Sequence, residues 1–564
     1  MAPDEYDELT GPAMTRHALL VKAIITGGAA SMLGARPALG ALDRTVGVRG
    51  AEKATPTRGG TLLLAAAPSL RGFDPQKFWD GFVWSGTLAI SDSLLWVGDD
   101  LKLHPNLVSL PKITRGGTLY TFKLRRGVRF HHGREMTADD VKFSLERIVT
   151  PEFACEGSSL YTGIPIVGLA DVVNQKAKTI SGIKAVDRYT VSIAMEKPDS
   201  ALPFLLSLPF ASVVPRDVVQ QLGDAKFNLA PVGTGAFTMS NVDLAKGFTL
   251  KRFPKYWNPA RPYLDGVQAT VGIDPSLAAL KIERGELDMM QQRPPLDLVV
   301  QLRDSFDKSA QLVLKAYNLW YYFTLNVQQY EPLKDVRVRR AIAMSLDRKR
   351  LVRSLRGLAA VAPGGLFSPQ TPYYQKSIQI PFNPAAAKGL LRDAGYANGF
   401  DIEVLGGSGS PDKEMVQNAA FDLQQVGLRP TVTLTKGGQF GARAYHGNPP
   451  PMTAYVWDLP YPHGSYFIDG AFTSAAVAAQ CCDLSMYATS RVDRLAQQAH
   501  TEQDPAKIAK IYKEIDKIVV HDEVAAIPMI QDIRIELMSK RVRGFKVPKT
   551  FTTPHFFKDY WLKK

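Results

Sequence analysis

The chain has 564 residues, of which 45% are hydrophobic and 22% are charged, and its formal net charge is +14. This length and apolar content are sufficient for several hydrophobic cores, so we expect two or three domains and exclude extensive disorder. The lysines and arginines are scattered, with no long basic run and no recognisable nucleic-acid motif, so we expect a solvated surface and no nucleic-acid partner.

Residues 14–41 have the pattern of a secretory signal peptide. Positive charge just after Met14 is followed by an apolar stretch from Ala23 to Ala35 and by a small-residue cleavage site at Ala38-Leu39-Gly40. Residues 1–13 are acidic, the wrong sign for such a start, so we expect translation to begin at Met14. The alternative is an amphipathic N-terminal helix of a cytosolic protein. No cysteine lies at the cleavage region and no later run is long enough to span a membrane, so we expect an exported, soluble protein without a lipid anchor.

The mature chain begins with a polar linker over 42–57 and a buried strand over 59–64. Farther along, Tyr120, Phe122 and Leu124 alternate with polar side chains. This period of two predicts a strand with one buried face.

A helix is predicted directly after this strand region. Thr137 can cap its N-terminus, and Asp140, at the third helical position, can reach back to the cap. Val141, Leu145 and Ile148 would form its apolar stripe. These features describe a scaffold and carry no catalytic chemistry.

The rest of the chain alternates strands with helices. By the same criteria we expect strands over 248–253 and 320–327, and helices over 277–284 (ending at Gly285), 335–347, 383–395 and 504–520. This alternation is typical of α/β layers.

The run GVRFHHGREMTADDVKFSLER, Gly127 to Arg147, resembles a signature of the extracellular solute-binding proteins of peptide/nickel-type ABC importers, solute-binding protein family 5. His132 departs from it, because an aspartate or asparagine is usual there. Further landmarks follow in the family's order: PVGTGAF from Pro231, Tyr256-Trp257, GELD from Gly285, VRVRRAIAMSLDR from Val336 and NPAAAKGLLRDAGY from Asn383. The resemblance covers roughly residues 58–550.

The resemblance implies an α/β, two-lobe periplasmic binding protein fold that closes on a solute like a hinged trap. The first lobe would comprise 57–315 and 525–564, with an inserted subdomain over 91–200, and the second lobe would comprise 316–524. The implied function is to bind a peptide or a similarly sized solute in the periplasm, as a monomer, and to deliver it to an ABC permease in the inner membrane. Other possible solutes are an oligosaccharide, an opine-like conjugate or a chelated metal.

Two segments match groove-lining positions of the family. Asp80-Gly81-Phe82 resembles the segment that meets a peptide backbone, and Tyr455-Val456-Trp457-Asp458 resembles the strand before the aspartate that holds a peptide's α-ammonium group. A carboxylate is needed there because a buried ammonium group must be paired. The ligand-binding residues implied by the resemblance are Asp80, Gly81, Phe82, Tyr455, Trp457, Asp458 and His463.

The chain departs from the family at that aspartate. The usual run is W-x-x-D-Y-P-D-P, whereas Pro460 stands at the aspartate position and His463 replaces the second acid. Asp458 could supply the charge from two residues earlier if no β-bulge intervenes. Either Asp458 or Asp80 anchors an amine, or the ligand has none. The alternatives are core packing for Trp457 and a cap or salt bridge for Asp458.

Enzyme motifs are incomplete in this sequence, so we expect no catalytic residues, no resident metal and no cofactor. The run from Gly406 to Ser410 lacks the final glycine of a nucleophile elbow, and His131-His132 lacks the spacing of a metalloprotease helix. An enzyme built on the same scaffold remains the competing class. The three cysteines, Cys155, Cys481 and Cys482, are too few for a disulfide framework, and we expect no essential disulfide, although one of the adjacent pair could bridge to Cys155.

Overall fold

The computed structural model describes residues 44–46, 55–68, 70–305, 310–362, 364–376, 378–436, 438–445, 448–479, 482–550 and 554–563. They fall in one compact unit, Asp43–Lys564. The expected signal peptide over 14–41 and the preceding residues 1–13 lie outside the described residues. Within the described ranges, no helix combines the length and apolar character needed to cross a membrane.

One large mixed sheet organises the fold. Its order is β16-β15-β17-β13-β18-β12-β2-β11-β10-β9, with two short strands attached, β1 to β13 and β14 to β18. The strands are β1 (Arg44–Val46), β2 (Thr61–Ala65), β9 (Phe237–Asp243), β10 (Gly247–Arg252), β11 (Gly266–Thr270), β12 (Met289–Met290), β13 (Ala310–Leu325), β14 (Ala359–Val361), β15 (Asp401–Gly407), β16 (Arg429–Thr435), β17 (Met452–Asp458) and β18 (Ala526–Ser539).

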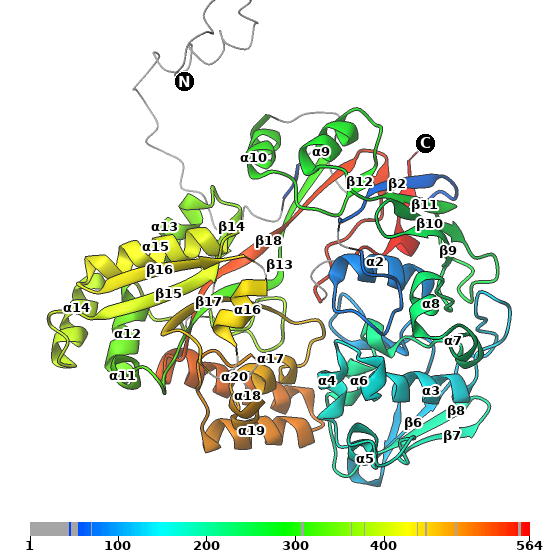
Figure 1. Cartoon of the computed structure of the whole chain (residues 1–564), viewed down its shortest axis with the longest axis horizontal. Coiled ribbons are helices and arrows are strands. Elements are labelled where there is room, and N and C mark those ends of the chain that lie inside the picture. Colours follow the sequence, from blue (N-terminus) through cyan, green and yellow to red (C-terminus); the bar gives the residue numbers. More distant parts are fainter. Residues whose placement is uncertain are drawn as a thin grey trace, which may run out of the picture. The chain divides into compact units, whose positions relative to one another are not determined.

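The long strands β13 and β18 connect the two halves of this sheet. They pair antiparallel, and their register shifts between Ala316 and Trp320. On the side of β13 lie β17, β15 and β16, and on the side of β18 lie β12, β2, β11, β10 and β9 (Figure 1). Below, the half with β2 and β9–β12 is called the first lobe and the half with β15–β17 the second lobe. The α/β two-lobe architecture expected from the sequence is confirmed.

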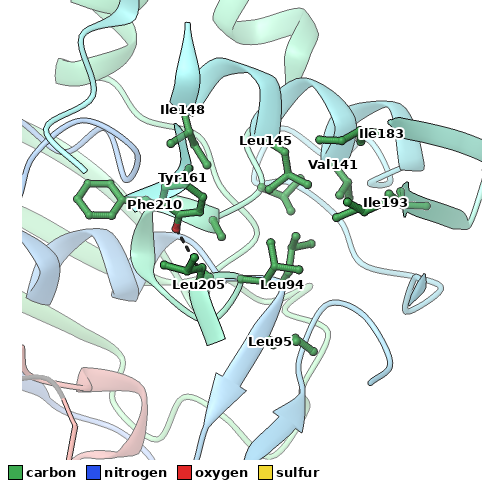
Figure 2. Packing of buried hydrophobic residues seen from close by; sticks show 14 of the residues in the cluster. Leu94, Leu95, Val141, Leu145, Ile148, Tyr161, Ile183, Ile193, Leu205 and Phe210 are labelled. Atoms are coloured by element: carbon green, nitrogen blue, oxygen red, sulfur yellow. Dashed lines mark hydrogen bonds between the residues drawn. The ribbon is translucent and has the colours of Figure 1, made fainter. Parts of the chain in front are cut away.

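An additional subdomain belongs to the first lobe. Its antiparallel sheet has the order β5-β6-β8-β7, formed by β5 (Lys112–Thr114), β6 (Leu119–Lys123), β7 (Ile183–Asp187) and β8 (Thr190–Ala194), and β3 (Leu95–Val97) pairs with β4 (Leu103–Pro105) beside it. Figure 2 shows the packing under this region, where the Tyr161 hydroxyl donates to the Leu205 carbonyl at 2.9 Å. The alternation expected for Tyr120, Phe122 and Leu124 is confirmed, since all three side chains are buried.

Helix α3 (Ala138–Val149) begins where the sequence predicts. The Asp140 carboxylate accepts from the Thr137 N–H at 2.9 Å, so the third helical residue reaches back to the cap. Val141, Leu145 and Ile148 are buried against the subdomain sheet. This start is set by local residues alone, which explains why the sequence pattern predicts it.

The remaining helices of the first lobe are α2 (Gly81–Ile90), α4 (Ser158–Thr162), α5 (Leu169–Val173), α6 (Leu202–Leu205), α7 (Arg216–Leu222), α8 (Asp224–Leu229), α9 (Pro275–Glu283) and α10 (Leu296–Ser305). The second lobe contains α11 (Glu331–Lys334), α12 (Val336–Ser345), α13 (Arg348–Ser354), α14 (Pro384–Asp393), α15 (Asp412–Gln425), α16 (Gly438–Ala444), α17 (Ser465–Ala471), α18 (Ser474–Ala479), α19 (Ser490–Thr501) and α20 (Pro505–Lys517). Two short strands near the C-terminus, β19 (Val542–Arg543) and β20 (Trp561–Leu562), pair with each other.

Alternation along β13 separates two cores in the second lobe. Tyr321 and Phe323 join the cluster formed with α12 and α15, whereas Trp320 and Tyr322 join the cluster formed with α17, α19 and α20. Because successive side chains of a strand point to opposite faces, one strand contributes to both cores.

Three expectations need correction. Residues 44–46 of the expected linker form β1, which pairs with β13. The expected strand at 320–327 starts ten residues earlier, at Ala310. Cys155 is a free buried thiol and Cys482 is disulfide-bonded, so the pairing suggested for Cys155 is wrong. Cys481 lies outside the described residues.

Candidate functional site

The first predicted segment, Asp80-Gly81-Phe82, forms the start of α2. The Asp80 carboxylate accepts from the backbone N–H groups of Phe82 at 2.8 Å and Val83 at 3.1 Å through a single oxygen, so Asp80 is the N-cap of the helix. This capping role stabilises α2 and fixes the orientation of its first turn. The sequence analysis did not anticipate it.

Phe82 lines a charged cavity of about 120 Å³ beside the connecting strands. The other residues that line this cavity are Gln291, Arg293, Tyr317, Asp532, Ile533, Arg534, Ile535 and Glu536. Gln291 fixes α2 to the cavity wall, because its side-chain amide donates to the Phe82 carbonyl at 3.2 Å. The charged cavity therefore joins one sequence-predicted site residue to polar groups of β13 and β18.

Asp532 is the central acid of the charged cavity. Its side chain is 6% exposed, and it lies 3.4 Å from the Arg293 guanidinium, whose side chain is 36% exposed. The Tyr317 hydroxyl donates to the other oxygen of Asp532 at 3.2 Å. Burial raises the pKa of Asp532, and Arg293 opposes that shift only in part. A carboxylate held in this way is stabilised by any further cation that enters the cavity.

A second acid is coupled to Asp532. Burial raises the pKa of Asp412 to about 6, with further contributions from the charges of Glu414 and Asp532. Asp412 lies at the start of α15 in the second lobe, whereas Asp532 lies on a connecting strand. The negative field therefore extends from the connecting strand toward the second lobe.

The second predicted segment contributes Tyr455 and Trp457 to an aromatic wall, defined here as Trp79, Tyr455, Trp457 and Tyr466. The ring centroids of Tyr455 and Trp457 are 5.6 Å apart, and those of Trp457 and Tyr466 are 5.7 Å apart. Trp79, from the first lobe, stacks on Tyr466 at 5.9 Å with an interplanar angle of 7°. The indole N–H of Trp457 is buried without a hydrogen-bond partner. A buried unsatisfied donor is costly, so a ligand acceptor at this position would be favoured.

The two residues that depart from the family pattern lie in different surroundings. Asp458 ends β17 opposite Leu319, in regular register, and its charge contributes to the raised pKa of Tyr466. His463 is 1% exposed, and its ring contacts the hydroxyls of Ser465 at 2.8 Å and Ser200 at 3.1 Å. Asp458 thus borders the aromatic wall, whereas protein side chains surround His463.

The sequence analysis missed Tyr466, Arg293 and Asp532. One signal was available for Asp532: the mostly apolar strand AIPMIQDIRIELMS, Ala526–Ser539, carries charged residues at alternate positions near its middle. Charges inside a central strand indicate a lined cavity or a paired network. Among the described residues, no cluster of three or more histidines, cysteines or acids could hold a metal ion.

Comparison with known proteins identifies the family. The profile of the bacterial extracellular solute-binding proteins, family 5, matches residues 102–479. The Dipeptide-binding protein of Escherichia coli K12 is 26% identical over 512 residues, covering 86% of this chain and 92% of the relative. The Glutathione-binding protein GsiB of the same strain is 24% identical over 489 residues, covering 86% and 91%.

A solved structure has the same fold. The periplasmic binding protein DppA of Helicobacter pylori, in complex with the peptide STSA, superposes with a TM-score of 0.74 at 23% identity, covering 90% of this chain and 99% of that one. Because the family profile spans most of the chain, the protein belongs to the bacterial extracellular solute-binding proteins, family 5.

Proposed function

We propose that this protein is the periplasmic receptor of an ABC importer, which binds a peptide between its two lobes and presents it to the membrane permease. Family membership over residues 102–479 carries the proposal, and the named ligands of similar proteins favour a peptide. The charged cavity and the aromatic wall supply the two kinds of contact that a small zwitterion with side chains needs.

The charged cavity would bind the polar ends of the peptide. Arg293 can hold a carboxylate, since its contacts to Asp532 are long, at 3.4 and 3.5 Å, and its side chain is partly exposed. Asp532, with Asp412 nearby, would attract an ammonium group in place of the family aspartate that Pro460 replaces. This assignment supports a free amine in the ligand, anchored at a different position.

The aromatic wall would pack against the side chains of the peptide. Trp457 and Tyr455 come from the second lobe and Trp79 from the first, so a solute between them touches both lobes. Such two-sided contact is what drives closure, because it is complete only when the lobes meet. Asp80, Gly81 and Phe82 would orient α2 at the rim, and Asp458 would border the wall.

We propose binding without catalysis. One serine–histidine contact has the distance of a nucleophile and its base, Ser200 to His463 at 3.1 Å. However, burial lowers the pKa of His463 to about 3, so the ring is a poor base, and the Ser200 hydroxyl is directed at the Ala499 carbonyl at 2.9 Å. These features support a structural role for the pair.

The test is solute binding by the purified mature protein, measured by isothermal titration with a set of dipeptides and with glutathione. We expect saturable binding that Arg293→Gln and Trp457→Ala each weaken by about tenfold, since each change removes a charged or aromatic contact. Arg188→Gln, at an exposed arginine of the subdomain, is the matched control and should bind like the unaltered protein. Absence of binding to every peptide, together with retention of a non-peptide solute in native mass spectra, would overturn the proposal.

A further inference from the structure

Beside the aromatic wall, a second set of contacts joins the two lobes. The segment Lys197–Phe204 follows β8 of the subdomain and lies against α19 and the loop before α17 in the second lobe. The Lys197 ammonium donates to the Gln497 side chain at 2.9 Å, and the Ser200 N–H donates to the His500 carbonyl at 2.8 Å. These partners are about 300 residues apart in the sequence, so only the tertiary fold brings them together.

Ser200 and His463 continue this contact. The Ser200 hydroxyl lies 2.9 Å from the Ala499 carbonyl, which can only accept. Ser200 therefore donates to Ala499 and accepts from Nε2–H of His463 at 3.1 Å, while Nδ1 of His463 receives the Ser465 hydroxyl at 2.8 Å. This pattern fixes one neutral tautomer, which agrees with the lowered pKa of His463.

His500 lies between two acids from different lobes. Its Nδ1 is 3.1 Å from Asp199 of the first lobe, and its Nε2 is 2.6 Å from Asp469 of the second. The Asp199 side chain is 5% exposed and that of Asp469 is 40% exposed. Burial alone would lower the pKa of His500, but the hydrogen bonds to Asp199 and Asp469 outweigh it and raise the pKa to about 10.

An apolar contact accompanies these polar ones. Tyr461 of the second lobe is 2% exposed and is a member of the hydrophobic cluster of the first lobe. Its ring stacks with Phe204 at 6.5 Å, and Phe204 also meets His463 at 5.6 Å. This side of the contact is apolar, and a low local dielectric strengthens the hydrogen bonds beside it.

We propose that Asp199, Ser200, His463, Asp469 and His500 form a latch that holds the two lobes closed over the solute. The proposal rests on the proposed function, since a latch between lobes matters only if the lobes separate to admit solute. When they separate, Asp199 leaves His500 and Ser200 leaves His463. The latch residues contact one another and are not part of the aromatic wall or the charged cavity. They would therefore act on the solute only by holding the lobes in position.

The latch makes solute affinity dependent on pH. Asp469 stays beside His500 when the lobes separate, so closure raises the pKa of His500 through Asp199. A histidine whose pKa is higher in the closed state stabilises that state fully below its open-state pKa and loses this effect as the pH rises toward about 10. Affinity should therefore fall across this window. The charged and titratable groups that face the latch are Asp199, Asp469, His463, Lys197, Tyr120, Tyr461 and Tyr512. Among them, burial lowers the pKa of His463 far below the window and raises the pKa values of Tyr120, Tyr461 and Tyr512 above it.

The experiment compares the unaltered protein with His500→Gln and Asp199→Asn, using the dipeptide or glutathione that raises the thermal midpoint most. At pH 6.5 we expect each variant to bind about tenfold more weakly, because one charged hydrogen bond between the lobes is lost. We also expect His500→Gln to abolish the fall in affinity between pH 6.5 and pH 10. His104→Gln is the matched control: His104 of β4 pairs with Asp100 at 2.9 Å within the subdomain, at an exposed position. Should His500→Gln fail to fold, Asp469→Asn at the partly exposed acid replaces it, with a several-fold loss expected.

The outcomes separate the latch from the proposed function. If no peptide binds, the peptide proposal fails, and the latch is then tested by the radius of gyration of the solute-free protein at pH 6.5. A smaller radius for the unaltered protein than for His500→Gln supports the latch, and equal radii overturn it. If peptide binds and compacts the protein, wild-type affinity and an unchanged pH profile in His500→Gln overturn the latch alone.

Discussion

Replacing Arg147 by methionine should strongly destabilise the protein, although this residue is not part of the aromatic wall. The Arg147 side chain is 5% exposed and its partner Asp74 is 1% exposed. The guanidinium donates to Asp74 at 3.1 and 2.5 Å, to the Gln76 side chain at 3.0 Å and to Asp224 at 2.6 Å. It thereby joins α3 to the segment that precedes α2.

The expected magnitude follows from this burial. Removing one partner of a buried pair leaves the other charge unpaired, which costs about 3–5 kcal/mol. Asp224 is about half exposed and can be hydrated, so Asp74 accounts for most of the loss. Urea unfolding followed by circular dichroism should show a lower midpoint for Arg147→Met, and adding Asp74→Asn should restore part of the stability because the orphaned charge is removed.

A matched exposed pair serves as the control. Arg188 lies 3.6 Å from Glu135 in the same subdomain, with side-chain exposures of 58% and 22%. Arg188→Met should change the unfolding free energy by less than about 1 kcal/mol, because an exposed ion pair contributes little. Equal effects of Arg147→Met and Arg188→Met, or no recovery on adding Asp74→Asn, would refute the reasoning.

Two further predictions concern buried titratable groups. Burial raises the pKa of Asp516 to about 7, so ionisation of this carboxyl group reduces the stability of the fold increasingly above about pH 4. Asp516→Asn should therefore raise the melting temperature at pH 8 but not at pH 4, by an amount equivalent to at most about 4 kcal/mol. An equal shift of the melting temperature at both pH values would contradict this. Burial raises the pKa of Cys155 to about 12, so the thiol should resist alkylation in the folded protein at pH 8 and react after unfolding in urea, with mass spectrometry of the Cys155 peptide as the measurement.

The sequence predicts elements whose signals are local. The capped start of α3 needs only Thr137 and Asp140, and the buried face of β6 needs only alternating residues. The start of β13 at Ala310 was missed because its pairing with β18 supplies the stabilising hydrogen bonds from more than 200 residues away. The strand β1 depends on the same kind of long-range pairing.

The candidate site shows the same division. Family motifs direct attention to Trp457 and Phe82, and the structure adds the residues that surround them, such as Tyr466 and Asp532. No periodicity in the sequence could reveal that His500 lies beside Asp199, since the two meet only where the lobes touch. Charges at alternate positions of a mostly apolar strand were the one local hint of the charged cavity.

The central claim is that a peptide binds between the lobes, and native mass spectrometry of the freshly purified mature protein tests it most directly. We predict a 1:1 complex with a solute of peptide mass, either retained from the cell or formed on adding dipeptides or glutathione, and a weaker complex for Trp457→Ala. A protein that retains no solute and forms no complex with any of these peptides would contradict the account.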